Sequence, residues 1–291
     1  MSYAKKSELI EMVKEALKED IGARDITSEL LIPPDKTVKA VILAKEDLVI
    51  CGMEVAALVF RVMDKKIRFK AYLRDGATVK KGRIIASVSG KARSILGAER
   101  TALNFLCFLS GIATKTRKFA QVAKNYKVKI LDTRKTIPGW RLLQKYAVRI
   151  GGGFNHRLTL EEMVMVKDNH IKVIGDRLWV LGFQGIKNKI LPRIEIEVKT
   201  IEEFRKALAL KPDIIMLDNM KPAEIKEAVK LRNILSPNPC RPTPKLEASG
   251  GITLDNLRKF AASGVDFISA GELTHSIDSV DISLEIIDGK V

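Results

Sequence analysis

The sequence is poor in the residues and segments that disulfide scaffolds, metal-thiolate sites and membrane spans require. Its 3 cysteines, Cys51, Cys107 and Cys240, lie far apart, which excludes a disulfide framework and a cysteine-based zinc site and fits a reducing compartment. No apolar run approaches the roughly 18 residues of a membrane helix, and the N-terminus leads into a charged helical pattern instead of a signal-peptide core. We therefore expect a cytoplasmic protein with no membrane partner.

Aromatic residues are also scarce, at 5%, although the formal net charge is +16. A basic chain attracts polyanions, but nucleic-acid binding favours a basic stripe with interleaved aromatic side chains. Here the lysines are scattered over the whole chain, which is typical of a solvated surface. We expect no specific nucleic acid partner and only weak, salt-dependent retention on DNA.

The pattern of apolar residues changes partway along the chain. The first third combines an amphipathic helix over 8–20 with short strands and helices, which indicates a small α+β unit. From about Val128, short apolar strands alternate with helices six or seven times, which predicts a parallel sheet. No reversal of strand order is evident, so a reduced or incomplete α/β barrel over about 110–275 is favoured, shorter than the usual eight-unit barrel.

Charged residues gather just after the predicted strands. In α/β barrels the active site lies at the carboxyl ends of the strands. One Arg-Lys pair after a strand is usually only solvated, but three such clusters at successive strand ends are less easily explained by chance. They indicate a site for a highly anionic ligand, and the side chains concerned are Arg134, Lys135, His156, Arg157 and Lys167.

The later strand ends carry carboxylates and glycines. Glu197 and Asp218 are either ion-pair partners of these cations or, as their positions favour, ligands of Mg²⁺ together with phosphate oxygens. Ser249-Gly250-Gly251 is either an ordinary turn or a phosphate site, because Thr253 is a good helix N-cap. Gly151–Gly153 lacks the context of a nucleotide motif. No nucleophile is evident, so catalysis would depend on positioning and electrostatic stabilisation.

At these residues the sequence resembles the quinolinate phosphoribosyltransferase family. The matching stretches occur in the family's order and span about Ala98 to Ser276. They are 98–106, 110–114, 131–136, 151–157, 166–171, 215–220, 247–252 and 273–276.

The resemblance implies both an activity and an architecture. The reaction is Mg²⁺-dependent transfer of a phosphoribosyl group from phosphoribosyl pyrophosphate to quinolinate with loss of CO₂, a pentosyl transfer in de novo NAD synthesis. An N-terminal α+β sandwich-like domain would span 1–109 and be joined by the C-terminal segment 276–291. An open, about seven-stranded parallel barrel would span 110–275. The chain would form a homodimer, or a hexamer built as a trimer of dimers.

The resemblance also implies a role for each matching residue. Arg100 would reach the neighbouring subunit's site, and Lys135 would lie near the reacting centre or the pyrophosphate. The quinolinate carboxylates would be held by Arg134, His156, Arg157 and Lys167. Mg²⁺ and the ribose hydroxyls would be held by Glu197 and Asp218, which with Lys135 form the expected catalytic set. The 5′-phosphate would be held by Ser249, Gly250, Gly251, Ala270 and Gly271.

Some positions depart from the family pattern, and other functions are open. Ile137, Trp140, Thr159 and Ala270 are unusual there, but none of them removes a charged group. A related protein of molybdenum utilisation shares the barrel, and the intact Lys167–His170 run speaks against it. A nicotinate-using transferase would not need cations for two carboxylates.

Overall fold

The computed structural model describes residues 6–175, 193–235 and 243–287. The chain divides into two compact units. Unit 1 comprises Met1–Arg117, Leu142–Gly152 and Ile277–Val291, and unit 2 comprises Lys118–Arg141 and Gly153–Ser276. The sequence predicted divisions at 109/110 and 275/276, and it assigned 142–152 to the barrel.

Unit 1 is built on an antiparallel sheet in the order β12-β1-β5-β3. Its strands are β1 (Thr37–Ala44), β3 (Arg68–Ala71), β5 (Ile84–Lys91) and β12 (Ile282–Ile287). The segment near the end of the chain returns to this sheet as β12, which pairs with β1, Ala40 opposite Ile286. A small two-stranded sheet joins β2 (Leu48–Val49) to β4 (Thr78–Val79).

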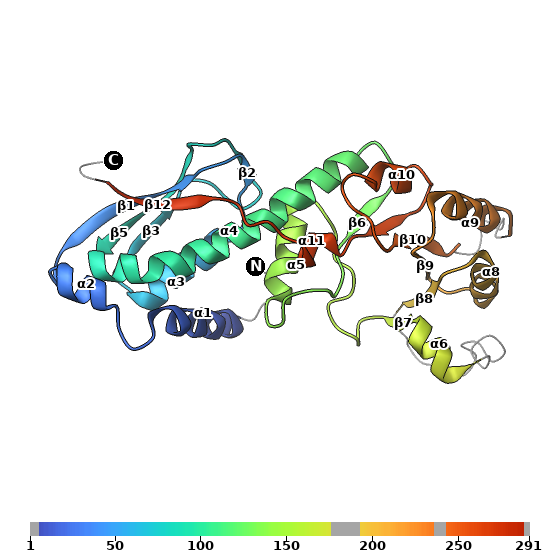
Figure 1. Cartoon of the computed structure of the whole chain (residues 1–291), viewed down its shortest axis with the longest axis horizontal. Helices are drawn as coiled ribbons and strands as arrows, with labels where there is room; N and C mark the ends of the chain where they lie inside the picture. The colour runs from blue at the N-terminus through green and yellow to red at the C-terminus, as the bar shows by residue number, and fades with distance from the viewer. Residues whose placement is uncertain (1–5, 176–192, 236–242, 288–291) are drawn as a thin grey trace. The chain divides into compact units, whose positions relative to one another are not determined.

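Helices α1 (Lys6–Ile21), α3 (Met53–Met63) and α4 (Ala92–Ala123) lie on one side of this sheet in Figure 1. The short helix α2 (Ile26–Leu31) precedes β1. Contrary to the sequence-based expectation, α4 contains an 18-residue window that is apolar enough to cross a membrane, with a mean hydropathy of 1.2. Because 61% of that window is buried inside the protein, a core helix explains the same composition.

An unanticipated helix, α5 (Arg141–Gly151), explains why 142–152 belongs to unit 1. The hydroxyl of Tyr146 donates to Asp75 at 2.8 Å, and Asp75 also accepts from the amides of Gly52 and Met53 at the start of α3. Gly151 lies against α4, since a Cβ there would meet Thr116 at 2.5 Å.

Unit 2 holds a parallel sheet of six strands in the order β6-β11-β10-β9-β8-β7. The strands are β6 (Lys129–Leu131), β7 (Val164–Val166), β8 (Ile194–Val198), β9 (Ile214–Asp218), β10 (Lys245–Ser249) and β11 (Phe267–Ser269). A parallel bridge between Leu131 and Phe154 adds a short seventh position beyond β6. In the described part of the chain the parallel barrel is thus six strands and a bridge.

The helices of unit 2 are α6 (Asp168–Ile174), α8 (Ile201–Leu210), α9 (Pro222–Leu235), α10 (Leu257–Ala261) and α11 (Glu272–His275). Helix α8 contacts β8, β9 and α9, and α10 contacts α9. Strands β8, β9 and β10 are mostly buried, as expected for parallel strands covered on both faces. Because all six strands run the same way, their carboxyl ends meet at one edge.

Candidate active site

A cavity of about 830 Å³ opens at the carboxyl ends of the strands of unit 2. All of the predicted site residues except Arg100 and Ala270 line it: Arg134, Lys135, His156, Arg157, Lys167, Glu197, Asp218, Ser249, Gly250, Gly251 and Gly271. Ala270 is buried at the end of β11, where its amide donates to the carbonyl of Leu131. Arg100 lies on α4 within unit 1.

Two arginines form the most buried cationic part of the cavity wall. The guanidinium of Arg157 donates to the carbonyl of Met163 at 2.9 Å. Burial, and then the charge of Arg134, lowers the pKa of Arg157 from its usual value. The buried Nε atoms of Arg134 and Arg157 have no hydrogen-bond partner within the described residues. Two adjacent cations with unused donors need an anion to offset them.

The two lysines of the site are held by their backbones. The carbonyl of Lys135 accepts from the hydroxyl of Thr274 on α11 at 2.8 Å. The amide of Lys167 donates to Nδ1 of His170 at 3.0 Å, which gives His170 a structural role at the start of α6. The ammonium of Lys167 lies 3.9 Å from Glu197.

Two carboxylates face this cationic wall from β8 and β9. Burial, and then the charge of Asp218, raises the pKa of Glu197 above its ordinary value. One oxygen of Asp218 accepts from the side-chain amide of Asn219 at 2.8 Å. Two carboxylates that repel each other at the rim of a cavity are the donor set that Mg²⁺ prefers when substrate oxygens complete its shell. The described residues therefore fit a bound Mg²⁺.

Beside these carboxylates, the residues at the ends of β9 and β10 are joined by a backbone hydrogen bond. Asn219 has a positive φ of 57°, and its amide donates to the carbonyl of Ser249 at 2.8 Å. Gly250 has φ of +96° and no room for a side chain. The expected helix N-cap at Thr253 is wrong: α10 begins at Leu257, because Asn256 accepts from the amide of Thr253 and holds the intervening segment as a turn.

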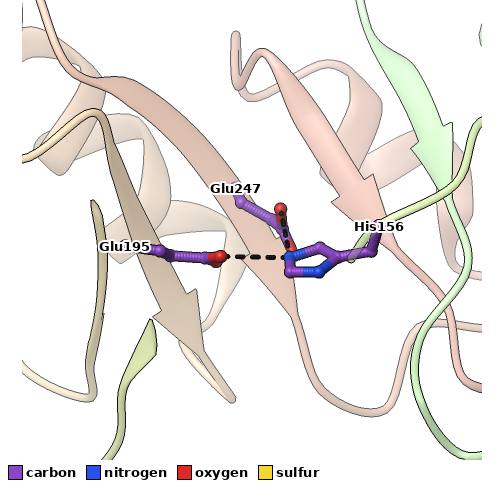
Figure 2. Close-up of side chains that lie close together, drawn as sticks. All are labelled: His156, Glu195 and Glu247. Carbon is purple, nitrogen blue, oxygen red and sulfur yellow. Dashed lines mark ion pairs between the residues drawn. The ribbon is translucent and has the colours of Figure 1, made fainter. Parts of the chain in front are cut away.

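Below the rim lies a buried group of three side chains that the sequence did not reveal as a cluster. Nε2 of His156 lies 3.0 Å from Glu195 and 3.6 Å from Glu247, and both glutamates are fully buried (Figure 2). Burial, and then the charge of Glu195, raises the pKa of Glu247 to about 8. Within the described residues, this is the one group of three potential metal-ligating side chains.

The sequence-based prediction gave no role to several other lining residues: Thr133, Met165, Met216, Asn219, Glu272, His275 and Ser276. The alternation of apolar and charged residues over Arg193–Val198 could have indicated that Glu195 belongs to the site. Residues two apart on a strand share a face, so Glu195 and Glu197 project from the same face of β8. Glu247 stands two residues before Ser249 in the same relation.

The fold and the cavity are those of an α/β-barrel enzyme whose charged side chains gather at the strand ends. Comparison with known families identifies it further. The model of the quinolinate phosphoribosyl transferase C-terminal domain matches residues 112–285, and that of the N-terminal domain matches residues 25–110. The chain belongs to the quinolinate phosphoribosyltransferase family.

Individual relatives agree with this assignment. A probable carboxylating nicotinate-nucleotide pyrophosphorylase of Methanocaldococcus jannaschii is 42% identical, covering 96% of this chain and 97% of its own. The Bacillus subtilis protein of the same name is 40% identical, covering 92% and 90%. The solved structure of nicotinate-nucleotide pyrophosphorylase from Francisella tularensis is 39% identical, with a TM-score of 0.87 and 98% of each chain covered.

Proposed function

We propose that the chain converts quinolinate and phosphoribosyl pyrophosphate to nicotinate mononucleotide, pyrophosphate and CO₂, in de novo NAD biosynthesis. Membership of the family carries this proposal, and the composition of the cavity supports it. A dicarboxylate and a pyrophosphate repel each other, so a small cavity can hold both only if several cations offset their charge. The lining cations Arg134, Lys135, Arg157 and Lys167 supply such an excess.

The planar arginine forks suit the two quinolinate carboxylates, because a guanidinium binds a carboxylate through two parallel hydrogen bonds. We assign the carboxylates to Arg134, Arg157 and Lys167, with His156 beside them. Lys135 follows as the cation nearest the departing pyrophosphate. The turn Ser249-Gly250-Gly251, together with Gly271, takes the 5′-phosphate. Support for these roles comes from their common cavity and, for Arg134 and Arg157, from buried Nε atoms that have no hydrogen-bond partner within the described residues.

We assign Mg²⁺ and the ribose hydroxyls to Glu197 and Asp218. When bound, the ion neutralises charge on the pyrophosphate as it departs. The two carboxylates also face the ribose, whose anomeric carbon gains positive charge as its bond to pyrophosphate lengthens. A negative side chain beside that carbon stabilises the transition state more than the ground state.

The bond changes then need no covalent intermediate with the protein. The pyridine nitrogen forms a bond to the anomeric carbon, and pyrophosphate leaves with the electron pair of the broken C–O bond. The ring nitrogen is now a pyridinium. Its positive charge stabilises the electron pair that stays on C2 when the C2–carboxylate bond breaks and CO₂ departs, and this pair on C2 then takes a proton from water. The protein holds the geometry and limits access of water.

We further propose a cytoplasmic homodimer, or a trimer of such dimers, in which Arg100 serves the partner's site. Light scattering of the purified protein tests the subunit number. Mixing Arg100→Ala with Arg134→Ala protein tests the shared site: if Arg100 acts across subunits, one site of each mixed dimer regains both arginines and activity rises above that of either variant alone. Activity that stays at the level of the separate variants would contradict the shared site.

The decisive assay gives purified protein quinolinate, phosphoribosyl pyrophosphate and Mg²⁺ and follows nicotinate mononucleotide. We expect turnover with quinolinate and little or none with nicotinate. Arg134→Ala loses most of the activity while circular dichroism shows that the protein stays folded. Activity of the wild type with nicotinate but not with quinolinate would refute the assignment.

A further inference from the structure

In the described part of unit 2, His156 lies against two buried glutamates, Glu195 and Glu247, to which the proposed chemistry gives no role; we call these three residues the trio. Glu195 projects from β8 and Glu247 from β10, and both point at the same ring nitrogen of His156 in Figure 2. Both glutamates have no solvent exposure. Burying two carboxyl groups is costly unless they have a specific partner, so their presence here calls for a function.

Both ring nitrogens of His156 have partners. Its Nδ1 accepts from the amide of Arg157 at 2.9 Å, and its own backbone amide donates to the buried Asp132 at 2.9 Å. Nε2 meets Glu195 and Glu247, and the side chain is only 8% exposed. These contacts fix the ring at the wall of the cavity, which both His156 and Glu247 line.

The trio is also coupled to the neighbouring arginine. The charge of Glu195 favours the charged form of Arg157, while the charge of Arg134 opposes it. Glu195 therefore offsets part of the repulsion between the two arginines. A negative charge beside two arginines is an arrangement that holds the cations ready for a dicarboxylate.

We propose that Glu195 and Glu247 are positioning residues of the dicarboxylate subsite, which act by fixing the ring of His156 and, next to it, Arg157. This inference rests on the proposed function for the identity of the substrate. It predicts an effect mainly on quinolinate, because Glu195 and Glu247 contact His156, and His156 and Arg157 are assigned to the quinolinate carboxylates.

The test is a double-mutant cycle on Glu195→Gln and His156→Ala. We expect each single variant to raise KM for quinolinate at least tenfold while KM for phosphoribosyl pyrophosphate changes less than twofold. In the double variant, the rise in KM for quinolinate should be at most about twice that of the more affected single variant. Effects of two residues that act through one another do not add in free energy. Glu195→Asp should recover part of the affinity. If Glu195→Gln does not fold, Glu247→Met, which removes the polar group at similar size, enters the same cycle.

A matched control separates positioning from loss of stability. Asp266→Asn replaces a carboxylate in the same unit that pairs with Arg232 and Lys245, outside the cavity lining. It should lower Tm and leave both KM values unchanged. The inference fails if the trio variants leave KM for quinolinate unchanged, raise both KM values equally or multiply their effects.

Two further results keep this inference distinct from the proposed function. Wild-type protein without quinolinate turnover would refute the proposed function itself, whereas active wild type with unaffected variants would refute only the positioning role. Elemental analysis of the purified protein supplies the second result. One equivalent of a transition metal that His156→Ala loses would show that the trio is a metal site, and would overturn the positioning role.

Discussion

Asn219 and Gly250 pack so closely that a Cβ on Gly250 would lie 2.6 Å from the side-chain Cγ of Asn219. The two residues follow neighbouring parallel strands, whose last residues Asp218 and Ser249 stand opposite each other. Asn219 in turn donates to the carboxylate of Asp218. The contact thus connects the proposed phosphate turn with the proposed metal ligand.

Gly250→Ala should therefore damage binding of the ribosyl donor. The φ of +96° costs an alanine about 1–2 kcal/mol, and its methyl group displaces Asn219 and with it Asp218. We expect KM for phosphoribosyl pyrophosphate to rise at least tenfold in steady-state assays. Gly82→Ala is the control, because Gly82 has a φ of +85° but nothing within 4 Å of its Cβ position. Equal kinetics for the two variants would contradict the linkage.

Arg157→Lys should weaken quinolinate binding although it keeps the charge. In Arg157 one guanidinium nitrogen donates to the carbonyl of Met163, and the same side chain lines the cavity. A lysine has a single nitrogen and cannot do both in the same geometry. A hydrogen bond from a charged group contributes about 1.5–3 kcal/mol, so KM for quinolinate should rise about ten- to a hundredfold. Arg232→Lys, at the ion pair with Asp266, should lower Tm alone. An unchanged KM in Arg157→Lys would show that charge suffices.

Removing Mg²⁺ with a chelator should abolish turnover, and adding it back should restore turnover. Because the pKa of Glu197 is raised by burial and by Asp218, protons compete with the ion for this carboxylate at a higher pH than for an ordinary glutamate. Activity at limiting Mg²⁺ should fall as the pH drops through that raised pKa, and excess Mg²⁺ should move the fall to lower pH. A pH profile that does not respond to Mg²⁺ concentration would argue against Glu197 as a ligand.

Glu197→Gln provides the mutational counterpart. It should require far more Mg²⁺ for half-maximal activity, because the amide oxygen carries no charge. Glu224→Gln changes an exposed glutamate on α9 that accepts from the amide of Lys221, and it should leave the Mg²⁺ requirement unchanged. Titration of activity with Mg²⁺ for the three proteins measures the difference.

The sequence predicted the alternating strands and helices well, because short apolar runs that end in charged residues, or in Ser and small residues, mark strands β6 to β11. It placed the strand-end residues in one cavity for the same reason: parallel strands bring their carboxyl ends together. Helix α5 was missed, since its assignment to unit 1 depends on contacts of Tyr146 and Gly151 with residues far away in the sequence. The trio below the rim was missed because Glu195 and Glu247 become neighbours only when β8 and β10 share a sheet.

The buried carboxyl of Glu247 should make stability depend on pH in an unusual direction. Its pKa is about 8 in the folded protein, against an ordinary value of 4.5 when unfolded. Between these values the folded state binds the proton and the unfolded state does not, so the free energy of unfolding falls as the pH rises. The contribution has a limiting slope of about 1.4 kcal/mol per pH unit.

Glu247→Gln removes this titration. Urea unfolding at pH 5, 6, 7 and 8 should therefore show a free energy of unfolding that falls less with pH for the variant than for the wild type, and the difference between the proteins should grow steadily across that range. Asp266→Asn again serves as the control, because the pKa of Asp266 is lowered by its hydrogen bonds and ion pairs despite burial. Its contribution is constant above pH 5 and is lost only at more acidic pH. Parallel curves for wild type and Glu247→Gln between pH 5 and 8 would mean that Glu247 is already ionised in the folded protein.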